Sequence, residues 1–153
     1  MSMWLSDADF KSLIGLAPLV AIELLVYDEM DRWLVGLRRN PPAQGWWFNP
    51  GGRILKGERI AEAFCRITAS ELGEAYEIDH ARFHGVYEHF YEETFFGKGG
   101  TTHYITLAYH LPWRGGVLPT SQHNDYRWLS KEELLADERV HRYTKDYFRK
   151  GSS

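Results

Sequence analysis

The chain has 153 residues, of which 44% are hydrophobic, so it can bury a sizeable core, and 25% are charged, too few to favour disorder. Its net charge of −3 gives no general attraction to nucleic acid or to an acidic membrane, so we expect neither as a partner. The chain has a single cysteine, Cys65, so it cannot form a disulfide framework. No segment resembles a signal peptide or a membrane span. We therefore expect a single cytoplasmic domain over residues 1–153.

Apolar periodicity and turn residues divide the chain into strands and helices. Ser6 with Asp9 three residues later predicts a helix start, and Ser130 with Glu133 predicts a capping box. In chain order the expected elements are a helix from Ser6 to about Pro18, strands at 19–27, 33–37 and 46–48, a helix at 59–73, strands at 82–91, 102–111 and 127–129, a short helix from Ser130, and an amphipathic stretch at 139–149. Between them we expect a tight turn at 50–52, a mobile loop at 93–101 and a polar loop at 122–126.

Strands that flank one central helix, with further helices at both ends, are typical of an α/β or α+β layered domain. The short turn between the strands at 19–27 and 33–37 predicts a hairpin, which favours a mixed sheet over a parallel one. Glu23 interrupts the first apolar run. We interpret it either as a residue on a solvent-exposed part of the sheet or as a residue in a cleft.

The most informative stretch is 51–73, in which a glycine pair opens a helical pattern and a single glycine closes it. On a wheel of roughly 100° per residue, one apolar face is shared by Ile60, Ala63, Phe64 and Ile67. Glu71 lies in the same face. A carboxylate that points inward must be neutralised, paired or bound to a cation, so Glu71 is a candidate for chemistry.

The stretch also carries a spaced motif, Gly-x5-Glu-x7-Arg-x4-Glu-x-Gly, formed by Gly52, Glu58, Arg66, Glu71 and Gly73. This motif resembles the Nudix box, a loop–helix–loop that holds a divalent cation against a diphosphate. The resemblance implies the Nudix fold, a mixed β-sheet sandwiched between helices, and one Mg²⁺ per subunit that Mn²⁺ can replace. We expect Glu58 and Arg66 to form an ion pair that supports the helix.

Two carboxylates of the usual Nudix box are missing from this motif. Ile67 stands where a Glu follows the Arg, Ser70 stands where the first Glu of a pair is usual, and Glu74 replaces a hydrophobic residue. Ordinary Nudix pyrophosphatases use these carboxylates to hold further metal or to activate water. Their loss argues against attack of water on phosphorus.

Longer stretches resemble one branch of the superfamily, the GDP-mannose mannosyl hydrolases, whose box lacks the same two carboxylates; they are residues 38–53, 87–91, 101–104 and 122–129. This resemblance implies Mg²⁺-dependent hydrolysis of GDP-mannose, with GDP-glucose as a further candidate substrate. Water would attack C1 of the sugar with inversion, GDP would leave, and the enzyme would be a homodimer. The alternatives are a Nudix pyrophosphatase that cleaves a nucleoside diphosphate sugar at phosphorus, and a non-catalytic nucleotide-sugar-binding protein.

The same resemblance assigns metal ligands and a base. It implies that the Gly51 carbonyl, Glu71 and Gln122 bind Mg²⁺, and that His123 is the general base. A histidine suits that role because its pKa lies near neutrality. Taken alone, His123 would be interpreted as a surface histidine of a polar loop; the surrounding motif changes that interpretation.

Five residues receive roles in holding the substrate. The resemblance implies that Arg38 and Arg53 stabilise the departing diphosphate, as the forked guanidinium suits phosphate oxygens. Tyr104 would hydrogen-bond the leaving group, and His89 would line the sugar pocket together with Glu23. Without the resemblance, Arg38 is equally well a solvated charge at a strand end, and Tyr104 a core residue.

Overall fold

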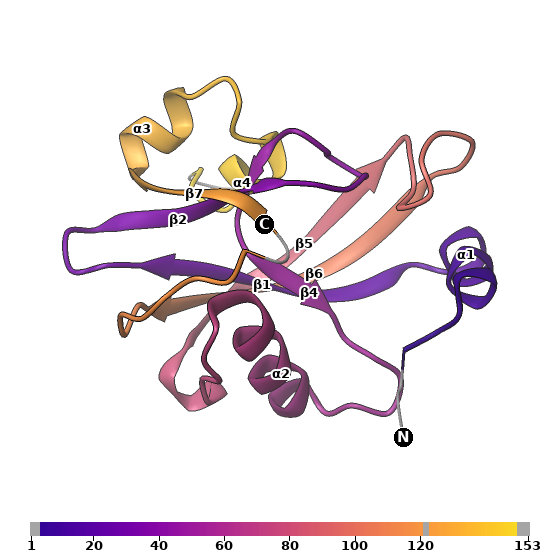
Figure 1. Ribbon diagram of the computed structural model, residues 1–153, viewed down its shortest axis with the longest axis horizontal. Coiled ribbons are helices and arrows are strands. Elements are labelled where there is room, and N and C mark those ends of the chain that lie inside the picture. Colours follow the sequence, from indigo (N-terminus) through magenta and orange to yellow (C-terminus); the bar gives the residue numbers. More distant parts are fainter. Residues whose placement is uncertain (1–3, 121–122, 150–153) are drawn as a thin grey trace.

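The computed structural model describes residues 4–120 and 123–149 and shows a mixed sheet with helices on both of its faces (Figure 1). Its elements in chain order are α1 (Asp7–Leu16), β1 (Leu19–Tyr27), β2 (Arg32–Arg38), β3 (Trp47–Phe48), β4 (Gly51–Arg53), α2 (Ile60–Leu72), the 3-10 turn η1 (Ile78–His80), β5 (Arg82–Tyr91), β6 (Thr102–Pro112), β7 (His123–Ser130), α3 (Lys131–Ala136) and α4 (Arg142–Asp146).

The sheet has the order β3-β2-β1-β6-β5, with β4 added beside β1 and β7 beside β2. The pairing of β1 with β6 is parallel and that of β5 with β6 is antiparallel, so the predicted mixed sheet is confirmed. α2 packs on one face of the sheet, over a core that includes Ile22, Leu24 and Phe64. α3 packs on the opposite face through Leu134, and α4 lies on that side too (Figure 1).

The central strands separate in a way that opens the middle of the sheet. β1 meets β2 at Tyr27 and Trp33, as the predicted hairpin requires. Beyond that point β1 pairs with β4, while β2 pairs with β3 and β7. The short link Asn49-Pro50 joins β3 to β4 and crosses the gap between the two halves. This crossing brings Asn49 to the side of Glu23, where its side chain donates a hydrogen bond.

The predicted orientation of Glu71 on α2 is confirmed, since its side chain is only 6% exposed and lies in line with buried Phe64 and Ile67. Gly73 ends the helix in the left-handed conformation at φ 81°, as expected of a glycine cap. Ile60 was expected on the buried face and is instead 45% exposed. It is the first residue of α2, where the chain enters the helix from an exposed loop.

Two predicted boundaries are wrong. Residues 50–52 were expected to form a tight turn, but Gly51–Arg53 form strand β4 against β1. β7 begins at His123 and not at 127, because it continues to pair with β2 as far as Arg38. In both cases, cross-strand pairing overrides a local composition that is typical of loops. The amphipathic stretch predicted at 139–149 contains the short helix α4.

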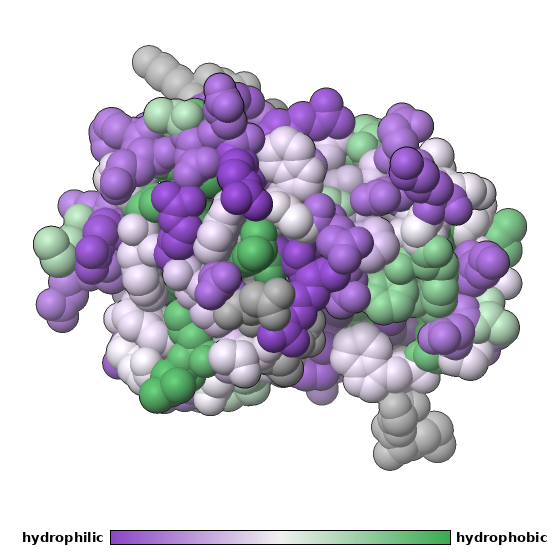
Figure 2. Space-filling view, turned by 45° about the horizontal axis from the view of Figure 1, so that its top comes forward, coloured by the Kyte–Doolittle hydropathy of each residue, from purple (hydrophilic) through white to green (hydrophobic). Residues whose placement is uncertain are grey.

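The outer elements complete the frame. Ser6 caps α1 and Ser130 forms the predicted capping box with Glu133. Phe95 of the loop at 93–101 packs against Phe10 of α1, with ring centroids 6.0 Å apart. Figure 2 shows a surface on which hydrophilic residues predominate and apolar residues gather in small groups. No helix within residues 4–120 and 123–149 is long and apolar enough to cross a membrane.

Candidate active site

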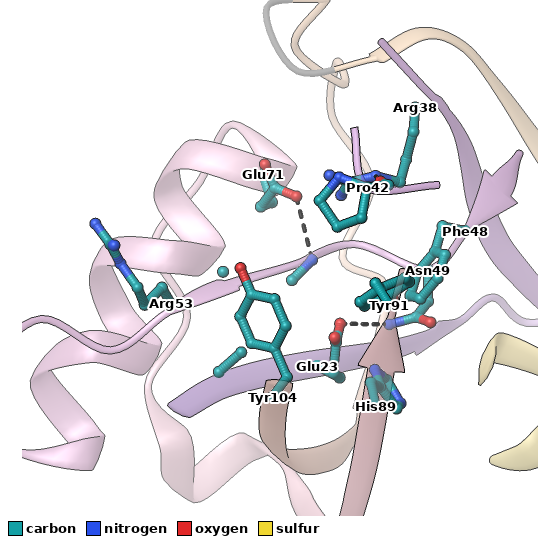
Figure 3. A pocket seen from close by; sticks show the side chains of 13 residues that line it. Glu23, Arg38, Pro42, Phe48, Asn49, Arg53, Glu71, His89, Tyr91 and Tyr104 are labelled. Carbon is teal, nitrogen blue, oxygen red and sulfur yellow. Dashed lines mark hydrogen bonds between the residues drawn. The ribbon is translucent and has the colours of Figure 1, made fainter. Parts of the chain in front are cut away.

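A pocket of about 80 Å³ lies where β1 and β2 separate, and it is lined by residues from β1, β2, β4, α2, β5 and β6 (Figure 3). Predicted site residues that line it are Glu23, Arg38, Gly51, Arg53, Glu71, His89 and Tyr104. These residues span more than eighty positions of the sequence, and the sheet brings them to one place. The second interpretation of Glu23, as a residue in a cleft, is therefore confirmed.

Glu71 and the backbone of Gly51 meet at one edge of β4. The Gly51 amide donates a hydrogen bond of 3.1 Å to Oε1 of Glu71. In the register with β1, Gly51 stands opposite Glu23 and Gly52 stands opposite Ile22, while the carbonyl of Pro50 accepts a hydrogen bond from the amide of Leu24. Gly51 therefore occupies the non-hydrogen-bonded position of this antiparallel pair. The amide and carbonyl of Gly51 therefore both point away from β1, toward the edge where Glu71 lies. Two oxygen donors, the carbonyl and the carboxylate, thus share one side of the pocket.

The glycines of β4 are required by close approach and not by an unusual backbone conformation. A Cβ on Gly51 would lie 2.1 Å from Oε2 of Glu23, and a Cβ on Gly52 would lie 3.1 Å from a side-chain carbon of Ile67. Both distances are shorter than an ordinary van der Waals contact. The glycine pair therefore lets β4 lie between the carboxylate of β1 and the apolar face of α2.

Glu23 is held at the base of the pocket by a buried polar network. Nδ2 of Asn49 donates a 2.8 Å hydrogen bond to Oε2 of Glu23, and Thr144 donates a 2.7 Å hydrogen bond to Oδ1 of Asn49. Burial raises the pKa of Glu23 to about 8, although the Asn49 hydrogen bond and the charge of Arg38 lower it and the charge of Glu71 raises it. Asn49 was not predicted as a site residue. Its role depends on Glu23 and Thr144, which are distant in sequence.

Two arginines lie on opposite sides of the pocket (Figure 3). Arg38 donates from Nε to the carbonyl of Pro42 over 2.9 Å, which fixes the base of its guanidinium. The guanidinium of Arg53 lies 4.1 Å from the ring centroid of Phe10, a cation–π contact. Its Nη1 is buried and has no hydrogen-bond partner among the described residues, so this cation can donate to an anionic ligand. Burial also lowers the pKa of Arg53.

His89 of β5 and Tyr104 of β6 are cross-strand partners and face the same side of the sheet. Burial raises the pKa of Tyr104, so its phenol stays protonated and can donate a hydrogen bond. Burial, with a smaller contribution from the charge of His141, lowers the pKa of His89 to about 3, so this imidazole is neutral near pH 7. Tyr91, two residues after His89 on the same face of β5, also lines the pocket and was not predicted. The two-residue alternation of a strand could have indicated it.

The predicted ion pair of Glu58 and Arg66 is confirmed, with 2.8 Å between Arg66 Nε and Glu58 Oε2. Hydrogen bonds from Arg66 lower the pKa of Glu58. Arg66 also donates from Nη2 to the carbonyl of Arg53 over 2.8 Å. The pair therefore ties α2 to β4 and holds in place the strand that carries both glycines and Arg53.

The described residues that line the pocket do not include two predicted site residues, Gln122 and His123. Gln122 lies outside the described residues. His123 opens β7, where its Cα is the cross-strand partner of Arg38, so its backbone stands beside a pocket residue. The role of each therefore stays a prediction.

The oxygen donors suit a hard divalent cation that keeps several waters. Within residues 4–120 and 123–149, no group of three or more His, Cys, Asp or Glu side chains is arranged to hold a metal. Glu71 and the Gly51 carbonyl nevertheless offer the oxygen ligands that Mg²⁺ prefers, and Mg²⁺ is commonly held by one or two carboxylates together with substrate phosphates. Of the positions at which the motif lacks a carboxylate, Ile67 is buried in the core and Ser70 is exposed.

Comparison with known proteins identifies the family. The family model of the NUDIX domain matches residues 17–150. The chain belongs to the Nudix family. The helix α2 with its flanking residues is accordingly the Nudix box, and the mixed sheet between helices is the Nudix fold.

Similar proteins agree with this assignment. The chain is 33% identical over 105 residues to the low-salt glycan biosynthesis protein Agl8 of Haloferax volcanii, which covers 69% of this chain and 65% of that protein. The chain thus spans less than two thirds of the length of this relative. Among solved structures, the MutT protein of Methanosarcina mazei Go1 has a TM-score of 0.69 at 21% identity, covering 86% of this chain and 91% of that one. The MutT Nudix hydrolase of Burkholderia pseudomallei has a TM-score of 0.67 at 24% identity, covering 86% and 95%. These structures show a common fold.

Proposed function

We propose that this Nudix protein hydrolyses GDP-mannose in the presence of Mg²⁺, releasing GDP and mannose through attack of water at C1 of the sugar with inversion. GDP-glucose is the second substrate to be considered. The observation that carries the proposal is the set of acidic groups in the pocket. Glu71 is the carboxylate that α2 contributes, and the positions of the further Nudix carboxylates are occupied by Ile67 and Ser70.

The pocket supports binding of a nucleoside diphosphate sugar. Arg38 and Arg53 place two cations on either side of a cavity that is too small for the whole ligand, so part of GDP would extend beyond it. Nudix enzymes generally use a divalent cation such as Mg²⁺, and here Glu71, the Gly51 carbonyl and Gln122 would hold it. Once bound, the cation would help to neutralise the diphosphate. The name of the Agl8 relative, a glycan biosynthesis protein, is consistent with a sugar-containing substrate.

The proposed reaction needs two kinds of group, donors that stabilise the departing diphosphate and a general base that activates water. Donors aimed at a departing diphosphate are commonly worth about 3–4 kcal/mol each in the transition state, and Arg38, Arg53 and Tyr104 would act in this way. A glycosidase normally protonates its leaving group, but a diphosphate stabilised by cations can leave without a proton. One general base would then suffice. We assign it to His123, whose backbone lies opposite Arg38.

Product identification with a panel of GDP- and ADP-sugars tests this proposal. We expect GDP and the free hexose from GDP-mannose when Mg²⁺ is present. GMP with mannose 1-phosphate would instead show a pyrophosphatase. Binding of GDP-mannose without turnover by the wild-type protein would indicate a nucleotide-sugar-binding protein. The homodimer implied by the family resemblance stays a prediction, which sedimentation of the purified chain can check.

A further inference from the structure

The short helix α4 lies behind the pocket and supports it through hydrogen bonds without lining its cavity. Two residues of this segment form hydrogen bonds with pocket residues or their partners: Thr144, and Tyr147, which caps the helix. Thr144 bonds to Asn49, which in turn bonds to Glu23. Tyr147 bonds to His89. All of these side chains are buried, so their hydrogen bonds fix side-chain orientation and exclude exchange with solvent.

The bond between Tyr147 and His89 belongs to a chain of three hydrogen bonds. The hydroxyl of Tyr147 lies 3.0 Å from Nε2 of His89 and 3.1 Å from Oγ1 of Thr106. Thr106 in turn donates to the backbone carbonyl of Tyr87 over 3.4 Å. A carbonyl can only accept, and each hydroxyl has one proton to give.

These constraints allow all three bonds to exist together in one direction only. The proton of Thr106 is committed to the carbonyl of Tyr87, so the bond between Thr106 and Tyr147 must be donated by Tyr147. The bond between Tyr147 and His89 must then be donated by His89, which places the proton of the neutral imidazole on Nε2. Its other ring nitrogen, Nδ1, is left with a lone pair for a group in the cavity that His89 lines.

We propose that Tyr147 is a positioning residue that fixes His89 in the Nε2–H tautomer, so that His89 accepts a hydrogen bond from a hydroxyl group of the ligand. The ring of Tyr143 stacks on His89 with centroids 4.2 Å apart and an interplanar angle of 8°, which holds the imidazole plane while Tyr147 selects the tautomer. The nature of the ligand rests on the proposed function: the free hydroxyls of a sugar would be the donors. A ligand without a hydroxyl at this position would leave the buried Nδ1 unpaired and would bind less well.

The tautomer can be measured in the free protein by long-range proton–nitrogen NMR of ¹⁵N-labelled histidine, with the His89 signals assigned by their loss in His89→Gln. We expect the pattern of a neutral imidazole protonated on Nε2 at pH 7. Thr106→Val removes the acceptor for the Tyr147 proton, and Tyr147 can then donate to His89, so this variant should show the Nδ1–H tautomer. A wild-type signal from the Nδ1–H form, or an unchanged tautomer in Thr106→Val, would overturn the proposal.

Matched tyrosine variants of the α4 segment separate positioning from packing. Tyr147→Phe removes the hydroxyl that meets His89, whereas Tyr143→Phe removes a hydroxyl that bonds to the backbone of Phe90. We expect mixed tautomers in Tyr147→Phe and the wild-type tautomer in Tyr143→Phe. In turnover of GDP-mannose, Tyr147→Phe should lower kcat/KM about tenfold, as expected for one lost hydrogen bond, and Tyr143→Phe should not.

If Tyr147→Phe and Tyr143→Phe had equal effects on the His89 tautomer and on kcat/KM, Tyr147 would have only a structural role and the proposal would be overturned. If Tyr147→Phe fails to fold, the wild-type and Thr106→Val spectra still decide. If the wild-type protein turns over no nucleotide sugar, the proposed function fails while the tautomer measurement keeps its meaning.

Discussion

Substituting Gly51 by alanine should destabilise the protein through close contacts with β1. The new Cβ would lie 2.1 Å from Oε2 of Glu23 and 2.7 Å from the carbonyl oxygen of Ile22. An ordinary contact needs about 3.5 Å, so the carboxylate must retreat by more than about 1 Å. Oε2 accepts the 2.8 Å hydrogen bond from Asn49, and that movement breaks it.

The expected magnitude combines two effects. Overpacking costs about 1–3 kcal/mol, and a buried polar group left without its partner costs about 1–3 kcal/mol, so Gly51→Ala should lower the free energy of unfolding by about 2–6 kcal/mol. Gly52→Ala is the matched control, because the nearest atoms that its Cβ would meet are side-chain carbons of Ile67, the closest at 3.1 Å. Neither glycine has a positive φ, so the entropy effect of alanine on the unfolded chain is the same for both.

Urea unfolding of the two variants, followed by fluorescence, measures this difference. In a Glu23→Ala background the penalty of Gly51→Ala should fall, because the carboxylate that it displaces is gone, although the carbonyl of Ile22 remains. A double-mutant cycle gives the coupling between the two positions. If Gly51→Ala were as stable as Gly52→Ala, the close packing of β4 against Glu23 would be refuted.

Three further predictions concern metal binding, catalysis and acid stability. Glu71→Gln should weaken Mg²⁺ binding in calorimetric titration, and an unchanged affinity would remove Glu71 from the ligand set. His123→Gln should lower kcat by about 10²–10⁴-fold while Mg²⁺ affinity is retained; near-wild-type turnover at mildly alkaline pH would contradict its assignment as the base. His89 has a folded pKa of about 3, below the value of 6.5 in the unfolded chain, so the unfolded state takes up the proton first and stability falls as pH drops from 6.5 toward 3. Its share of the slope is up to about 1.4 kcal/mol per pH unit, which His89→Gln should remove in urea unfolding between pH 4 and 6.5; equal slopes would show that His89 does not titrate in this way.

The Nudix box is the part of the site that the sequence predicts best, because its spacing is local. Helical periodicity alone places Glu71 on the buried face of α2, and the resemblance to the Nudix box led us to expect the ion pair of Glu58 and Arg66. Ile60 shows the limit of this reasoning. A helical wheel gives the direction of a side chain but does not show that the first turn of the helix extends beyond the part that is buried against the sheet.

Other features depend on contacts between distant segments. The sequence Pro50-Gly51-Gly52 has the composition of a turn, but pairing with β1 makes its glycines part of a strand, where they serve close approach. The polar residues at the start of β7 are strand because β2 is beside them. The role of Asn49 could not be predicted from the sequence, because its hydrogen-bond partners, Glu23 and Thr144, are distant in sequence and come close to it only in the folded chain.

The route of water attack is the central claim, and ¹⁸O-labelled water tests it most directly. The protein is incubated with GDP-mannose and Mg²⁺ in labelled water, and the products are analysed by mass spectrometry, with free mannose in the same water as the control for exchange at C1. Attack at C1 predicts label in mannose above that control and unlabelled GDP. Label in a phosphate group, in GMP or in mannose 1-phosphate, would contradict the account.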